Sequence, residues 1–312
     1  MKNTPLKIIY FGTADFAVPP LQALLNDQAS FEVVAVVSQP DRPAGRKGEL
    51  KASPVSAVAR ESGLDLFQPE KLDEKAIWTL QELEADVYVV AAYGLIMPHA
   101  VLDIPPGGAL NLHGSLLPKY RGASPIQTAI LEGETETGVT LMKMDAKMDH
   151  GAILDTVRVE IMETDDYLSL TGKLAEAAAG LLVEALPKYQ DGELTAEEQD
   201  HDAATYTKIL KKEDGRIDWN QPATRIERQI RAYRPWPGTF TADHLKILAV
   251  EIKDAPLPEG IAPGTITKTE DCEPLVACAD RWLKLEEVQP PSKKPMTGAD
   301  WLRGHPEIET LQ

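Results

Sequence analysis

The sequence predicts an α/β protein in which a doubly wound parallel sheet is followed by a small β-barrel. Two observations predict this class. Apolar runs alternate with helical patterns over the first half of the chain, and short apolar runs separated by Pro and Gly fill its last quarter. At 312 residues the chain is longer than one core usually serves, which favours two domains.

The strands predicted for the first domain are nearly all apolar, as strands of buried parallel sheets are. They span 7–11, 32–38, 64–68, 86–92 and 109–112, with helical periodicity between them at 19–26, 54–62 and 75–83. A sixth strand at 139–144 and an apolar helix at 168–186 follow. Because sheets of this class bind ligands beyond the carboxyl ends of their strands, we expect a site there.

The second domain is predicted from a change in composition. Residues 189–202 are rich in Glu, Asp and Gln, which is typical of a linker, and short strands are expected at 246–251, 264–268, 275–279 and 282–287. We therefore expect a catalytic domain over 1–188, a linker over 189–205 and a C-terminal domain over 206–312. Small five-stranded barrels often bind nucleic acid.

One run places polar side chains on alternate positions at the end of the fifth strand: Asn111-Leu112-His113-Gly114-Ser115-Leu116-Leu117-Pro118. In an extended chain Asn111, His113 and Ser115 project together. A clustered amide, imidazole and hydroxyl can polarise a carbonyl and manage a proton. Asp149, on a turn before Gly151, is a further candidate, but spacing alone does not place it beside His113, and an ordinary turn position remains an equal alternative.

Several functional classes are disfavoured. The first strand is followed by Gly12-Thr13-Ala14-Asp15-Phe16-Ala17, which has one glycine where a dinucleotide fingerprint needs three. Two cysteines and scattered histidines predict neither a disulfide framework nor a metal site. No long apolar window and no cleavable signal pattern occur, so we expect a cytoplasmic protein with no membrane partner.

The charge is negative overall but unevenly distributed. A net charge of −17 argues against a nucleic-acid partner, yet residues 208–234 contain eight Lys and Arg against four Asp and Glu. The Pro- and Gly-containing loop 39–53 is also basic. Solvated surface is the alternative interpretation of both segments.

Further motifs carry a family resemblance that covers essentially the whole chain. The strand-end run continues as Lys119-Tyr120-Arg121-Gly122-Ala123-Ser124-Pro125-Ile126, and Met148-Asp149-His150-Gly151 follows it. The other motifs are Ser38–Arg46, Tyr206–Ile209, Asp214–Trp219 and Arg231–Gly238. With them the chain resembles the folate-dependent formyltransferases, specifically those that act on methionyl-tRNA.

The resemblance implies a Rossmann-like catalytic domain, an OB-like C-terminal domain and a transferase of translation initiation. Its reaction would move the formyl group of 10-formyltetrahydrofolate to the α-amino group of methionine on initiator tRNA, with no metal. Asn111 and His113 would stabilise the oxyanion of a tetrahedral intermediate, and Asp149 would hold His113 and assist proton transfer. Folate contacts are expected at Ser115, Leu116, Leu117 and Pro118.

The same resemblance assigns the basic segments to tRNA. The loop 39–53 would enter the acceptor stem with Arg42 at the matching position, and phosphate contacts would come from the 208–234 segment. The expected tRNA-binding residues are Arg42, Arg46, Lys47, Lys208, Lys211 and Lys212, and we expect a monomer.

Three alternatives stay open. A sugar-nucleotide formyltransferase shares the catalytic residues and the length, but we would not expect the Pro40-Asp41-Arg42-Pro43 loop in it. A glycinamide ribonucleotide formyltransferase would lack so large a C-terminal domain. A noncatalytic RNA-binding protein would have no need of Asn111, His113 and Asp149.

Overall fold

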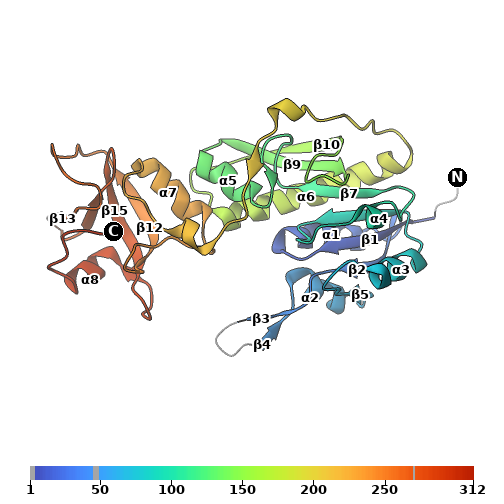
Figure 1. Ribbon diagram of the computed structural model, residues 1–312, viewed down its shortest axis with the longest axis horizontal. Coiled ribbons are helices and arrows are strands. Elements are labelled where there is room, and N and C mark those ends of the chain that lie inside the picture. Colours follow the sequence, from blue (N-terminus) through green and yellow to red (C-terminus); the bar gives the residue numbers. More distant parts are fainter. Residues whose placement is uncertain (1–3, 45–48, 270) are drawn as a thin grey trace. The chain divides into compact units, whose positions relative to one another are not determined.

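The computed structural model describes residues 4–44, 49–269 and 271–312 (Figure 1). The chain forms two compact units. The first unit comprises Met1–Pro125, Glu136–Glu160 and Leu170–Thr207, and the second comprises Ile126–Thr135, Ile161–Ser169 and Lys208–Gln312. Two short segments from the middle of the chain, 126–135 and 161–169, therefore belong to the same unit as the C-terminal residues. The expected division at residues 189–205 stays a prediction.

Within the described residues, the first unit is built on a seven-stranded mixed sheet in the order β10-β9-β7-β6-β1-β2-β5. Its strands are β1 (Leu6–Gly12), β2 (Phe31–Val37), β5 (Leu66–Phe67), β6 (Val87–Ala91), β7 (Ala109–His113), β9 (Glu136–Lys143) and β10 (Ile153–Glu160). The five strands predicted first pair in parallel, which confirms the doubly wound sheet. The sixth predicted strand, β9, is antiparallel to both β7 and β10.

The central strands are buried because helices cover both faces of such a sheet. Every residue of β6 is buried, and so is every residue of β1 except Lys7. The helices of the first unit are α1 (Val18–Asn26), α2 (Pro54–Glu61), α3 (Glu74–Glu82), α4 (His99–Leu102) and most of α6 (Tyr167–Gln190), with 3-10 turns at Asp15–Ala17 and His201–Ala203.

Local sequence fixes where two of these helices begin. The side chains of Ser53 and Asp73 accept the backbone N–H groups of Ser56 and Ala76, and so cap α2 and α3. Pro54 takes the first position of α2, where an N–H is not needed. The two capped helices flank the strand β5, which ends the sheet on that side.

Two further strand pairs lie outside the large sheet. β3 (Arg42–Ala44) and β4 (Glu49–Lys51) pair antiparallel and form an arm that extends away from the sheet of the first unit (Figure 1). β8 (Arg121–Gly122) pairs in parallel with β11 (Tyr206–Thr207). The segment from 189 to 207, expected to be linker and domain start, thus contributes a strand to the first unit.

The second unit contains an antiparallel sheet of short strands in the order β12-β15-β14-β13, with β16 beside β15. The strands are β12 (Lys246–Lys253), β13 (Ile266–Lys268), β14 (Pro274–Ala277), β15 (Trp282–Gln289) and β16 (Met296–Thr297), and the helices are α5 (Pro125–Glu132), α7 (Ala223–Ala232) and α8 (Gly298–Arg303), with a 3-10 turn at Lys212–Gly215. Its core includes Trp219, Ile226, Leu283 and Trp301. This antiparallel unit agrees with the small OB-like barrel predicted from the sequence.

Candidate active site

The end of β7 carries the first two candidate residues. Asn111 pairs with Val90 of β6 and Met142 of β9, and His113 pairs with Thr140 of β9, so the backbone of this segment is held on both sides. Two residues apart on one strand, the two side chains emerge on the same face of the sheet. The Asn111 side chain is half-buried and makes no hydrogen bond to any residue that the structure describes. Its two amide N–H donors are therefore available to a ligand.

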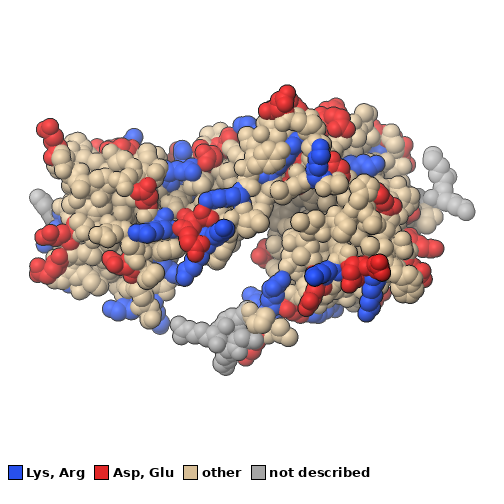
Figure 2. Space-filling view, viewed as in Figure 1, with Lys and Arg blue, Asp and Glu red and all other residues tan. Residues whose placement is uncertain are grey.

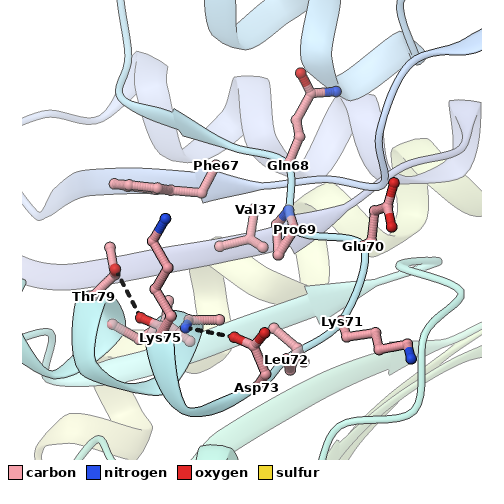
Figure 3. A pocket seen from close by; sticks show the side chains of 12 residues that line it. Val37, Phe67, Gln68, Pro69, Glu70, Lys71, Leu72, Asp73, Lys75 and Thr79 are labelled. Atoms are coloured by element: carbon pink, nitrogen blue, oxygen red, sulfur yellow. Dashed lines mark hydrogen bonds between the residues drawn. The ribbon is translucent and has the colours of Figure 1, made fainter.

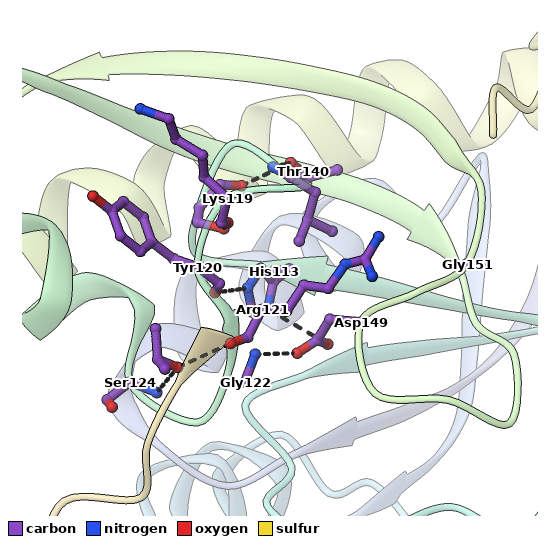
Figure 4. A network of polar contacts seen from close by, with 12 residues as sticks. His113, Lys119, Tyr120, Arg121, Gly122, Ser124, Thr140, Asp149 and Gly151 are labelled. Carbon is purple, nitrogen blue, oxygen red and sulfur yellow. Dashed lines mark hydrogen bonds and ion pairs between the residues drawn. The ribbon is translucent and has the colours of Figure 1, made fainter. Parts of the chain in front are cut away.

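The His113 ring lies between two acceptors. The side chain is only 7% exposed, and its Nε2 lies 3.0 Å from the carbonyl oxygen of Tyr120, to which Nε2–H donates. The other ring nitrogen, Nδ1, lies 3.6 Å from Oδ1 of Asp149 (Figure 4). A proton taken up on Nδ1 would face that carboxylate, which makes the ring able to carry positive charge.

Asp149 is held so that its two carboxylate oxygens have separate partners. Oδ2 accepts the backbone N–H of Gly122 at 2.7 Å, while Oδ1 faces His113. The backbone of Asp149 is in the left-handed region, with φ +49°, which Asp adopts more readily than most residues. The structure thus brings Asp149 beside His113, a pairing that residue spacing alone left open.

Gly151 is required by the turn that carries Asp149. A Cβ atom at this position would lie 1.8 Å from the backbone oxygen of Lys143, far inside contact distance. Gly122 is similarly constrained, because its φ is +111° and a Cβ would lie 2.7 Å from the Thr207 oxygen. Both glycines allow backbone segments to approach closely around the carboxylate.

The segment expected to contact folate continues directly from β7. Ser115 is fully buried, and its hydroxyl donates to the carbonyl of Lys119 at 2.6 Å. Thr140 ties this segment to β9: its hydroxyl donates to the Ser115 carbonyl at 2.7 Å and accepts the N–H of Leu117 at 3.0 Å. Leu116 and Pro118 are partly exposed. These four positions, Ser115 to Pro118, remain predicted folate contacts.

One expected tRNA contact of the first unit, Arg42, lies on the β3–β4 arm. Arg42 is exposed and makes no ion pair with any residue that the structure describes. The base of the arm is fixed, because Asp41 accepts hydrogen bonds from Gln68 at 2.7 Å and Arg60 at 2.8 Å. Both bonds hold the pKa of Asp41 below its usual range, and the bond from Gln68 has the larger effect. Arg46 and Lys47 lie outside the described residues.

The expected contacts of the second unit precede α7. Lys211 and Lys212 are exposed, whereas Lys208 pairs with Asp214. This pair, led by the hydrogen bond from Lys208, lowers the pKa of the Asp214 carboxyl. Figure 2 shows basic side chains gathered around α7 with acidic ones among them. The basic character deduced from the sequence is thus displayed on the surface.

A separate pocket of about 500 Å³ opens beside the carboxyl ends of β2 and β5. Figure 3 shows Phe67, Val37 and Leu72 along it, with Lys71 and Lys75 around it. None of Asn111, His113 and Asp149 lines this pocket. The candidate active site is therefore the polar cluster at the end of β7, and the pocket is no part of it.

No group of three or more His, Cys, Asp or Glu side chains among the described residues is arranged to hold a metal ion. None of the described helices has the length and apolar character needed to cross a bilayer.

Comparison with known proteins gives consistent results. Residues 6–186 match the formyl transferase family model, and residues 209–306 match the model of its C-terminal domain. The chain is 48% identical to the methionyl-tRNA formyltransferase of Chloroflexus aggregans, over 97% of this chain and 99% of that protein. The enzyme of the same name from a Roseiflexus species is 48% identical over 96% and 93%.

Solved structures with the same fold are more distant in sequence. The sugar 3N-formyl transferase WlaRD superposes with a TM-score of 0.67 at 18% identity, covering 93% of this chain and 100% of that one. This likeness bears on the fold alone.

Proposed function

The chain belongs to the formyl transferase family, and we propose that it transfers the formyl group of 10-formyltetrahydrofolate to the α-amino group of methionine on initiator tRNA. One observation carries the proposal at the level of residues. The Asn111 amide has no protein partner among the described residues, and it shares a face of β7 with an imidazole backed by a carboxylate. Such a donor set fits a carbonyl group that gains negative charge during amine attack.

The strand end would stabilise the developing charge. Asn111 donates an amide N–H to the formyl oxygen, and His113 stands two residues further along the same strand face. Asp149 stabilises positive charge on the ring through the 3.6 Å separation of Nδ1 and Oδ1. Because the three groups are fixed by strand pairing and by the Gly122 N–H, little reorganisation is needed during the reaction.

Removing the proton of the attacking amine does not require a strong base in the site. An α-amino group has a pKa of about 7.7–8.0, so much of it is already neutral near pH 7.5. Asp149 then need only accept or relay a proton as the tetrahedral intermediate forms, and that proton passes to N10 of the folate as the bond between N10 and the formyl carbon breaks. Orientation and oxyanion stabilisation supply most of the rate.

The proposal extends to the folate and tRNA contacts of the chain. Ser115 to Pro118 contact the folate, and Arg42, on the exposed arm, contacts the acceptor stem. Lys208, Lys211 and Lys212 hold tRNA phosphates, which position the substrate without reading sequence. The enzyme acts as a monomer in the cytoplasm and uses no metal.

A substrate comparison tests the function. Formyl transfer from 10-formyltetrahydrofolate is measured with three acceptors at matched concentration: methionyl initiator tRNA, methionyl elongator tRNA and an aminosugar nucleotide. We expect the highest kcat/KM with the initiator. Faster formylation of the aminosugar would replace the proposal by its sugar-nucleotide relative, and formylation of none would support a noncatalytic RNA-binding protein.

A further inference from the structure

A buried arginine behind the site makes no ion pair with a carboxylate of the described residues, although buried charges are usually paired in this way. Arg121, on β8, is 1% exposed. Its guanidinium donates to Gln199 Oε1 from Nε at 3.1 Å and from Nη2 at 2.7 Å, to His201 Nδ1 at 2.9 Å and to the Tyr206 hydroxyl at 3.3 Å. None of these acceptors is a carboxylate. Because a buried charge is costly unless hydrogen-bonded, these bonds hold the guanidinium in place and fix the acceptors around it.

Gln199 connects that arginine to the turn of Asp149. The side chain is 5% exposed, and its amide nitrogen donates to the backbone oxygens of Asp149 at 3.0 Å and Gly151 at 2.7 Å. Its oxygen meanwhile accepts two N–H groups of Arg121. Every hydrogen-bonding group of this amide is used, so its orientation is fixed by the arginine on one side and the turn on the other.

Gly122, the next residue after Arg121, holds the side chain of Asp149, whose backbone Gln199 holds. The Gly122 N–H donates to the Asp149 carboxylate at 2.7 Å, while the Arg121 side chain acts on the Asp149 backbone through Gln199. β8 therefore reaches Asp149 twice, directly through Gly122 (Figure 4) and indirectly through Gln199. Since Asp149 has a φ of +49°, a conformation that few residues adopt unaided, its turn needs such support.

We infer that Arg121 and Gln199 are positioning residues for the reaction, which set the backbone of Asp149 so that its carboxylate faces His113. The inference rests on the role proposed above for Asp149. Arg121 and Gln199 are assigned no contact with substrate. Their effect is on kcat through the geometry of the His113–Asp149 pair.

Two substitutions of Gln199 separate positioning from folding. Gln199→Glu keeps an acceptor for the buried Arg121 but places a carboxylate oxygen against the two turn carbonyls. Gln199→Met removes the same two hydrogen bonds without adding a charge. Gln289→Glu is the matched control, because that amide also donates to a backbone carbonyl, that of Lys293 at 2.9 Å, but in the second unit.

We expect each folded Gln199 variant to lose about 10- to 100-fold in kcat, with KM for the folate and for tRNA within about twofold of wild type. Circular dichroism and thermal melting establish folding, and Gln289→Glu should keep full kcat. In an Asp149→Asn background, Gln199→Glu should cause no further fall, because the carboxylate that it positions is already gone.

The outcomes are distinguishable. Wild-type kcat in folded Gln199→Glu, or losses that multiply in the Asp149→Asn background, would overturn the positioning role. Full activity of the Asp149→Asn single variant would instead overturn the proposed role of Asp149 itself. Loss of kcat in Gln199→Glu but not in Gln199→Met would assign the effect to the added charge, and would also overturn the inference.

Discussion

Replacing Asp149 by Asn tests the central pair of the site with the least change in shape. The Asn side-chain oxygen can still accept the Gly122 N–H, which is 2.7 Å from Oδ2 in the structure. What the substitution removes is the negative charge 3.6 Å from His113 Nδ1. The variant therefore isolates the electrostatic contribution of the carboxylate from its part in holding the turn.

The size of that contribution follows from the distance. Two unit charges 3.6 Å apart interact by about 4.6 kcal/mol at an effective dielectric constant of about 20. The side chains are only 7% and 15% exposed, so solvent screens the pair weakly. At about 1.36 kcal/mol per tenfold change in rate, full charge on the ring would be worth about 10³-fold. Because the ring gains partial charge in the transition state, we expect kcat to fall about 10²- to 10³-fold.

The assay is single-turnover formylation of methionyl initiator tRNA with saturating 10-formyltetrahydrofolate. KM should change little, since the lost interaction is strongest in the transition state. Asp149→Ala serves as the comparison, because it also removes the acceptor of the Gly122 N–H and should be at least as slow. A folded Asp149→Asn enzyme within fivefold of wild-type kcat would refute the electrostatic argument.

Four further predictions use the same assay or simple chemistry. Asn111→Ala should lower kcat by about 10²- to 10³-fold through loss of an oxyanion donor, and wild-type turnover would refute that role. Arg42→Ala should raise KM for tRNA and reduce the salt dependence of tRNA binding while folate binding stays unchanged; equal loss of both would indicate misfolding. Gly151→Ala, whose Cβ would meet a backbone oxygen at 1.8 Å, should lower stability by about 1–3 kcal/mol in a urea titration and also reduce kcat. Burial raises the pKa of the Cys278 thiol to about 12, so at pH 8 a thiol reagent should label exposed Cys272 at once and Cys278 only after denaturation.

The sheet could be predicted because its central strands are buried on both faces and therefore appear as continuous apolar runs. β10 lacked that signal. From Asp155 to Glu160 its residues alternate between half-buried and exposed positions, and it is the last strand of the sheet. The β3–β4 arm was likewise expected only as a loop, since strands of three residues leave no periodicity to detect.

Two residues of the candidate site could be predicted because a regular strand fixes which side chains share a face. Asn111 and His113 share one strand, and the period of two along a strand is fixed by backbone geometry alone. Asp149 is different, because β9 ends at Lys143, and Lys143 pairs with Leu110, three residues before His113 on β7. Strand pairing by itself leaves the chain near the amino end of β7, away from His113.

The loop after β9 must therefore return toward the carboxyl end of β7, and no local sequence pattern encodes such a return. It is held there by bonds from segments far away in the chain, the Gly122 N–H to its carboxylate and the Gln199 amide to its backbone. Gln199 lies in an acidic, Gln-containing stretch whose composition indicated only a linker. The strand supplies Asn111 and His113, whereas the position of the carboxylate beside His113 depends on long-range contacts. Substitutions in that stretch should therefore impair turnover before they impair folding.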